Sequence, residues 1–210
     1  MVGFMKEYKT VEFEADAQFI EKKSRFIGYV MPVKTQDDAT AFINKIKTKH
    51  WDATHNVSAY VLKTNNIQRS SDDGEPSGTA GVPVLDVILK EGLVDVCVVV
   101  TRYFGGTLLG AGGLIRAYSH ASKIAIEAGH IITMAPCKIL QISVDYSFYE
   151  RLNNLLSLYS ANIDNSEFTD KVTIKLSIKA QLADKLNNAL IEQSNGKYHF
   201  TEIGEHYSKV

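Results

Sequence analysis

Residue types that could do chemistry are concentrated between residues 72 and 118, in the stretch DDGEPSGTAGVPVLDVILKEGLVDVCVVVTRYFGGTLLGAGGLIRAY. Most of the chain's glycines lie here, and glycine adopts positive φ or lets backbone approach another group closely. The cluster indicates either a binding site or a tight strand-to-helix connection. We expect a site, because two isolated arginines, Arg102 and Arg116, flank the glycines.

The glycine loop follows a buried-looking strand and leads into a helix. It contains Gly105-Gly106 and then Gly110-Ala111-Gly112-Gly113. The unpaired N–H groups of a helix N-terminus suit a phosphate. However, no Gly-Lys-Ser/Thr follows, and Ile115 stands where a dinucleotide fingerprint needs Gly or Ala. The remaining readings are an anion or RNA-backbone cradle and a purely structural turn.

Three residues before the double glycine could bind nucleic acid. Arg102 could grip a phosphate with two hydrogen bonds, and Tyr103 or Phe104 could stack on a base. The alternative is that an aromatic packs in the core and that Arg102 pairs with Asp72 or Asp73.

An acidic run precedes the buried strand. Asp72, Asp73 and Glu75 place three carboxylates within four residues, which could bind a divalent cation or act as acid/base groups. The spacing is not that of an EF-hand, and a solvated turn would also explain it. His55 opens a strand and could face the glycine loop.

Known catalytic and metal motifs are absent from the sequence. It holds no HExxH, no C-x-x-C and no G-x-S-x-G. We therefore expect no zinc site and no cofactor, and an enzyme only if the residues above converge on a pocket. One further basic cluster, Lys22-Lys23-Ser24-Arg25, reads as a charged hairpin turn that could also contact phosphates.

Composition excludes several classes of protein. The net charge of −1 argues against a strongly basic nucleic-acid binder, although a local basic patch stays possible. Two cysteines are too few for a disulfide framework, and no apolar run reaches the length of a membrane span. The N-terminus lacks an apolar signal core, so we expect a cytoplasmic protein that does not bind membranes.

The pattern along the chain predicts two α+β domains, residues 1–134 and 137–210, joined by a linker at Met134-Ala135-Pro136. The first mixes strands at 8–20, 24–33, 54–63 and 94–101 with helices at 36–49, 79–90 and 108–128. The second begins with a strand at 138–146 and a helix at 147–160. Two strands at 162–169 and 171–180, a helix at 181–193 and a strand at 197–203 complete a ferredoxin-like βαββαβ order.

Four segments in this order resemble the IMPACT/YigZ family: KKSRFIG, ATHNVSAYV, SSDDGEPSGTAG and VVVTRYFGGTLLGAGGLIRAY. The resemblance implies a two-layer α/β N-terminal domain, like that of a small-subunit ribosomal protein and domain IV of elongation factor G. It implies a C-terminal domain like domain V of the same factor. Eukaryotic relatives are linked to translational control through a partner-binding domain that this chain lacks.

These expectations support one leading hypothesis and two alternatives. The leading one is a cytoplasmic RNA- or ribosome-binding regulator of translation, which contacts its ligand through Lys22, Arg25, His55, Arg102, Tyr103, Phe104, Gly105, Gly106 and Arg116. The first alternative is an enzyme acting on a small phosphorylated or carboxylated substrate at Arg102, Asp72 and His55. The second is a protein-interaction module on the polar face around Lys175 and Lys179.

Overall fold

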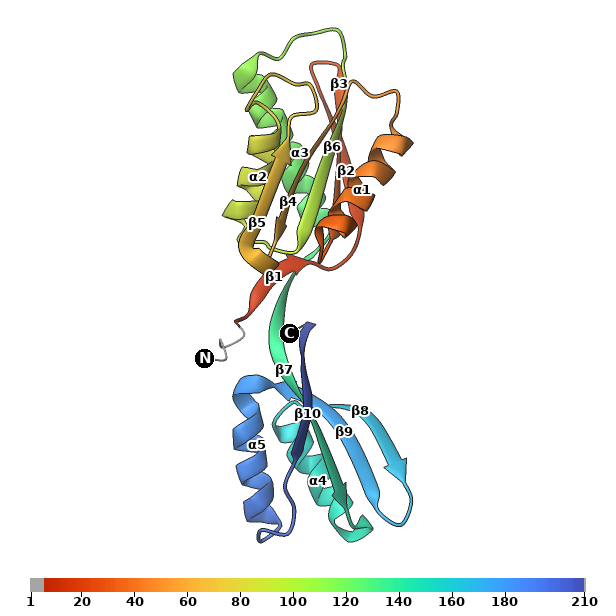
Figure 1. Ribbon diagram of the computed structural model, residues 1–210, viewed down its shortest axis with the longest axis vertical. Helices are drawn as coiled ribbons and strands as arrows, with labels where there is room; N and C mark the ends of the chain where they lie inside the picture. Colours follow the sequence, from red (N-terminus) through yellow and green to blue (C-terminus); the bar gives the residue numbers. More distant parts are fainter. Residues whose placement is uncertain (1–5, 210) are drawn as a thin grey trace. The chain divides into compact units, whose positions relative to one another are not determined.

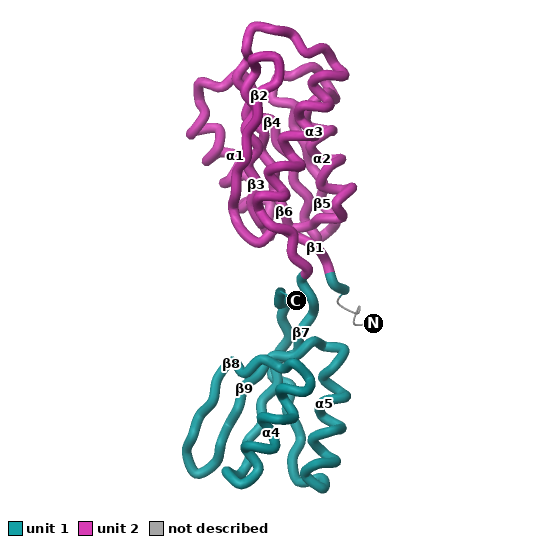
Figure 2. Tube along the Cα trace, turned by 180° about the vertical axis from the view of Figure 1, so that it is seen from behind, with its two compact units in different colours: residues 1–7, 134–210 teal, residues 8–133 magenta. Residues whose placement is uncertain are grey.

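The computed structural model describes residues 6–209 and divides them into two compact units (Figure 2). Unit 2 spans residues 8–133, and unit 1 contains residues 134–209 together with Lys6 and Glu7. Each unit has its own sheet and its own apolar core. The two-domain α+β fold expected from the sequence is confirmed.

The sheet of unit 2 has five antiparallel strands in the order β2-β3-β6-β4-β5. They are β2 (Ala15–Glu21), β3 (Ser24–Pro32), β4 (His55–Leu62), β5 (Ile67–Ser71) and β6 (Val96–Tyr103). The helices are α1 (Gln36–Lys49), α2 (Gly81–Lys90) and α3 (Ala111–Ala128), and a 3-10 turn covers Thr64–Asn66.

Helices cover both faces of this sheet. Helices α2 and α3 lie together on one face, and α1 lies on the other (Figure 1). The central strand β6 is therefore buried from Val96 to Arg102, which explains its continuous apolar run. Helix α1 begins at a capping box in which Thr35 and Asp38 bond each other's backbone N–H groups.

Unit 1 forms the ferredoxin-like arrangement. Its strands are β7 (Ile131–Val144), β8 (Asn162–Phe168), β9 (Val172–Lys179) and β10 (Thr201–Lys209), in the order β10-β7-β9-β8. Helices α4 (Tyr146–Leu158) and α5 (Ala180–Gln193) pack most of their leucines on the apolar face of the sheet. Strand β7, which begins in unit 2, also pairs with β1 (Tyr8–Val11).

The structure corrects three predictions about the elements. The strand expected over residues 8–20 is split into β1 and β2, and β5 was not predicted because IQRSS has no alternating apolar pattern. The linker prediction at Met134-Ala135-Pro136 is wrong, because these residues lie inside β7. Pro136 is tolerated there because it pairs with Tyr207 of β10 before the pairing with β9 begins at Cys137.

Candidate functional site

Several predicted residues meet at one end of the sheet of unit 2. Strands β2 and β6 end there, while β3 and β4 begin there, so that Arg102 lies opposite both Phe26 and His55. Gly105 touches the β2–β3 turn, since a Cβ at residue 105 would lie only 2.0 Å from the backbone of Lys23. The close approach requires glycine, and it joins the loop after β6 to the turn that carries Lys22 and Lys23.

Arg102 does not have the exposed position that a phosphate contact requires. Its side chain is 6% exposed and donates from one terminal nitrogen to Glu75 at 2.6 Å. Its second terminal nitrogen donates to the Ser24 hydroxyl at 3.4 Å. The partner is thus Glu75, neither Asp72 nor Asp73.

Glu75 receives a second hydrogen bond from a neutral phenol. The Tyr118 hydroxyl donates to Glu75 Oε1 at 2.7 Å, and burial, together with the neighbouring carboxylate, raises the pKa of Tyr118. His55 Nε2 lies 3.8 Å from the same oxygen, while His55 Nδ1 contacts the carbonyl of Asp73 at 2.8 Å. The result is a buried polar cluster made of Arg102, Glu75, Tyr118 and His55.

The other two acidic residues are used by the fold. Asp72 accepts hydrogen bonds from the backbone N–H groups of Gly78, Ala80 and Gly81. Burial opposes its ionisation, but these amides outweigh that effect and lower the pKa of Asp72. Asp72 therefore satisfies the N-terminus of α2.

The Asp73 carboxylate is also held by hydrogen bonds within the fold. It accepts from the backbone N–H of Asn56 at 2.7 Å and from Lys47 at 2.6 Å. Across residues 6–209, no group of three or more His, Cys, Asp or Glu side chains is placed to hold a metal ion. The acidic run is thus a structural loop, and its Glu75 lines the cavity described next.

A cavity of about 410 Å³ lies between this cluster and the start of α3. Its polar lining comes from Thr54, His55, Glu75 and Arg102. Its other lining residues are mostly apolar: Gly74, Pro76, Phe104, Leu108, Leu109, Gly110, Ala111 and Leu114. His55 and Arg102 therefore share one cavity with the glycine loop. Asp72, which the enzyme alternative places with them, does not line this cavity, and neither does Asp73.

The helix that begins at this cavity has no side-chain cap. Gly110 is the N-cap residue of α3, with φ 73°, and its lack of a side chain leaves the first N–H groups of the helix without a cap from this residue. Among residues 6–209, no side chain is seen to accept a hydrogen bond from these N–H groups. The loop before it exposes Phe104 and Leu108, of which 45% and 82% are accessible. Gly106 has φ 80° and no atom lies close to where a Cβ would be, so the positive φ is the reason for glycine at this position.

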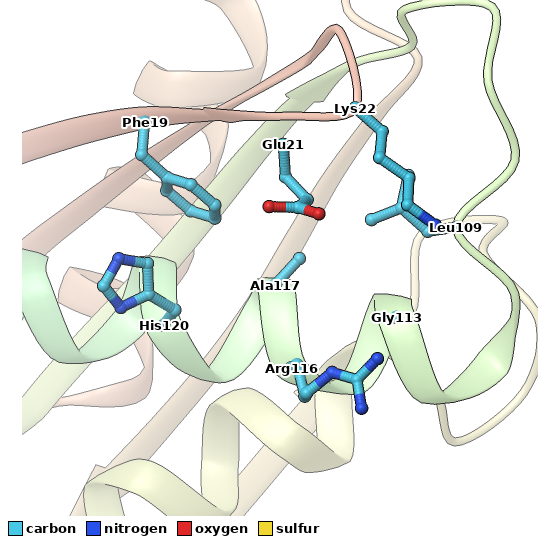
Figure 3. Close-up of a pocket in the computed structure, with 8 residues that line it drawn as sticks. All are labelled: Phe19, Glu21, Lys22, Leu109, Gly113, Arg116, Ala117 and His120. Carbon is cyan, nitrogen blue, oxygen red and sulfur yellow. The ribbon is translucent and has the colours of Figure 1, made fainter.

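A second hollow, of about 260 Å³, brings Lys22 and Arg116 to one place (Figure 3). Lys22 comes from the β2–β3 turn and Arg116 from α3, and both side chains are exposed. Glu21 also lines this hollow and points toward α3. His120 closes it with an edge contact to Phe19 at 4.7 Å.

Arg25 and Tyr103 lie in a different group. The Arg25 guanidinium stacks on the Tyr103 ring at 4.5 Å. The Tyr103 hydroxyl donates to Asp52 at 3.0 Å and contacts His50 Nδ1 at 2.9 Å. Burial, followed by the Asp52 hydrogen bond, raises the pKa of Tyr103. Tyr103 is thus a supporting residue on the α1 side.

Sequence reasoning missed three residues of the site. Tyr118 fits the apolar stripe of α3 and has the pattern of a core residue. Ser24 appeared only within the basic turn, and Thr54 carried no signal. The one available clue for Tyr118 was its hydroxyl, because a buried phenol needs a hydrogen-bond partner.

Comparison with known proteins matches both parts of the chain. A model of the Impact N-terminal domain matches residues 22–126, and a model of a domain of unknown function (DUF1949) matches residues 142–197. The chain is 40% identical over 191 residues to the IMPACT family member YvyE of Bacillus subtilis, covering 90% of this chain and 88% of that protein. The chain belongs to the IMPACT family.

Another IMPACT family member, from Haemophilus influenzae, is 33% identical over 98% of this chain and 100% of its own length. A crystal structure described as that of a hypothetical protein aligns with a TM-score of 0.61 and 28% identity, covering 96% and 99% of the two chains. The buried cluster and both hollows lie in or beside the segment that matches the Impact N-terminal domain. Among residues 6–209 of this IMPACT family protein, no helix combines the length and apolarity needed to cross a membrane.

Proposed function

We propose that the protein is an RNA- or ribosome-binding regulator of translation and that it holds RNA phosphates with Lys22, Lys23 and Arg116. The observation that carries the proposal is the position of these cations. All three are exposed beside the glycine loop, and no ion pair occupies any of them within residues 6–209. Family membership and the expected likeness to elongation factor domains support the same role.

The proposal differs from the sequence hypothesis in its cations. Arg102 is removed from the phosphate contacts because it is buried against Glu75. Arg25 is occupied by the Tyr103 ring. Lys23 replaces them, because the contact at Gly105 holds its backbone beside the loop. Exposed Phe104 is the residue available to stack on a base.

Salt-dependent binding tests the proposal. Binding of fluorescent single-stranded RNA and co-sedimentation with ribosomes would be measured between about 50 and 300 mM salt. Because each phosphate contact releases counterions, replacing Lys22, Lys23 and Arg116 by alanine should reduce the slope of log K against log salt by about 2 units.

The matched control removes the same charge from the opposite end of unit 2. Lys9, Lys34 and Lys90 are exposed there and are not in the hollow. Their triple alanine variant should keep the wild-type slope. The proposal would be contradicted if both triple variants reduced the slope equally, or if RNA binding did not depend on salt concentration.

Glu21 offers a test in the opposite direction. Its carboxylate lies in the hollow with Lys22 and Arg116 and would repel a phosphate there. Glu21→Gln should therefore raise RNA affinity. An unchanged or lower affinity would place the RNA elsewhere.

A further inference from the structure

The cavity next to the buried cluster has the chemistry of a small-ligand site. Its volume of about 410 Å³ falls in the usual range for ligand pockets, about 300–1,000 Å³. Apolar side chains form most of its wall, and a few polar groups converge on one side. None of Lys22, Lys23 and Arg116 lines it, so it is separate from the proposed phosphate contacts.

One end of the cavity suits an anion. Gly110 and Ala111 line the cavity and are the N-cap and first residue of the 18-residue helix α3, whose first N–H groups are capped by no side chain among residues 6–209. Such a terminus carries partial positive charge and donors that favour a phosphate. By contrast, Asp72 already supplies an anion to the N-terminus of α2.

A buried donor in the lining points the same way. Arg102 lines the cavity and is more than nine-tenths buried, yet its Nε has no hydrogen-bond partner among residues 6–209. A buried N–H group without an acceptor is unfavourable. Its accessible surface is below 1 Å², so a ligand oxygen reaches this N–H only if the Arg102 side chain shifts toward the cavity.

The same side of the cavity can accept hydrogen bonds from hydroxyl groups. The hydrogen bonds to the Glu75 side chain from Arg102 and Tyr118 both end on Oε1. A carboxylate accepts at both oxygens, so Oε2 can receive a donor. Carboxylates that bind ribose hydroxyls are a common way to recognise nucleosides.

The remaining wall suits a flat ring. Phe104 and Leu108 are exposed at the mouth, and Leu109, Leu114 and Pro76 continue the apolar surface. We infer that this cavity binds a nucleoside monophosphate, either free or as the phosphorylated end of an RNA chain. The phosphate lies at the start of α3, the ribose lies at Glu75 and Arg102, and the base lies against Phe104.

Calorimetric titration of the full chain with AMP, GMP, UMP, CMP, adenosine and inorganic phosphate tests this inference. At least one monophosphate should bind saturably. Adenosine and inorganic phosphate should bind at least about 10-fold more weakly than AMP, because each lacks one of the two recognised parts. The absence of saturable binding by all four monophosphates would overturn the inference.

Two variants locate the ligand without replacing a residue of the buried cluster. Ala111→Asp places a carboxylate at the first position of α3, where it occupies the N–H groups and repels phosphate; AMP affinity should fall at least about 10-fold. Phe104→Ala should weaken binding by about 10-fold through lost stacking. Wild-type AMP affinity in both variants would overturn the inference.

Gln36→Asp is the matched control, because Gln36 is the exposed first residue of α1 and lies outside the cavity. It should keep wild-type AMP affinity. Unchanged melting temperatures in Ala111→Asp and Gln36→Asp would show that both variants are folded.

A further comparison separates the two sources of ligand. RNA oligonucleotides with and without a 5′-phosphate would compete with AMP. Tighter binding of the phosphorylated oligonucleotide assigns the cavity to RNA ends, and tighter binding of AMP assigns it to a free nucleotide. If the Lys22, Lys23 and Arg116 variant loses RNA binding but keeps AMP binding, the two sites are independent.

Discussion

Unit 2 buries an ion pair, whereas unit 1 keeps its ion pairs near the surface. Arg102 and Glu75 meet at 2.6 Å with side chains only 6% and 3% exposed. Lys138 and Glu202 of unit 1 meet at 2.8 Å with side chains 26% and 43% exposed. The contacts have the same chemistry, but the first also required both charges to be removed from water.

This difference agrees with placing both proposed binding sites in unit 2. The core of unit 1 is apolar and needs no buried charge to hold its sheet and helices together. A buried pair is rarely the most stable way to fill a core, and hydrophobic residues of similar volume often do as well. The pair in unit 2 lines a cavity, which gives a reason for its presence other than stability.

The largest expected effect comes from breaking the buried pair. Arg102→Met leaves the Glu75 carboxylate buried without its cation and should lower the free energy of unfolding by about 3–5 kcal/mol. Urea unfolding of the variant and the wild type would measure this loss, and hydrogen exchange of the β6 amides would show it next to the broken pair.

A double variant then separates charge from packing. Replacing Arg102 by Met and Glu75 by Gln removes both charges but keeps an acceptor for Tyr118. It should recover part of the lost stability. A double variant less stable than Arg102→Met would contradict the account of an uncompensated charge.

The next effect tests the close approach of two loops. Gly105→Ala places a Cβ 2.0 Å from the Lys23 backbone, which must move, and overpacking of this kind lowers stability by about 1–3 kcal/mol. RNA affinity should fall with it, because Lys22 and Lys23 are displaced. Gly204→Ala in unit 1, where the nearest atom is a side-chain carbon at 3.6 Å, should change the melting temperature little.

A smaller effect follows from a buried histidine in unit 2. His50 Nε2 contacts the Tyr29 hydroxyl at 2.6 Å, and burial, then Lys49 and Arg25, lowers the pKa of His50. Since the unfolded chain binds this proton more readily, stability is fully present above the ordinary histidine pKa and falls as pH drops below it.

Urea midpoints at pH 7.5 and 5.5 check this sign. The wild type should be less stable at the lower pH, and His50→Gln should show a smaller difference between the two values. An identical pH dependence in the variant would assign the effect to other groups.

The smallest effect is expected at the surface pair of unit 1. Lys138→Met should lower stability by about 0.2–1 kcal/mol, because its charge is partly solvated and exposed ion pairs contribute little. A loss as large as that of Arg102→Met would remove the distinction between the two units. Thermal unfolding in low salt gives the most sensitive comparison.

Periodic patterns were sufficient to predict most of the fold. The alternation in KVTIKLSIKA and the helical spacing of the following leucines correctly predicted β9 and α5. They failed where neighbours outside the segment decide the structure. Strand β5 forms because β4 offers it a partner, and β7 passes through Pro136 because β10 pairs with it there, at Tyr207.

The site was harder to predict because burial decides its chemistry. The sequence predicted that His55, Arg102 and the glycine loop would come together, and they line one cavity. It could not indicate which of three neighbouring carboxylates would meet Arg102, because that choice depends on how the loop folds. The loop directs Asp72 and Asp73 to backbone amides and leaves Glu75 for the arginine.

Asp72 has one further consequence. A carboxylate tethered within the chain occupies the start of α2 at a fixed effective concentration, whatever the surrounding solution contains. An anion at α3 must arrive from outside, so its occupancy follows the law of mass action. Any molecule that binds there would raise the melting temperature of the unit in proportion to the logarithm of its excess over Kd. The melting temperature would then depend on ligand concentration through the start of α3, whereas the start of α2 would contribute the same stability at any ligand concentration.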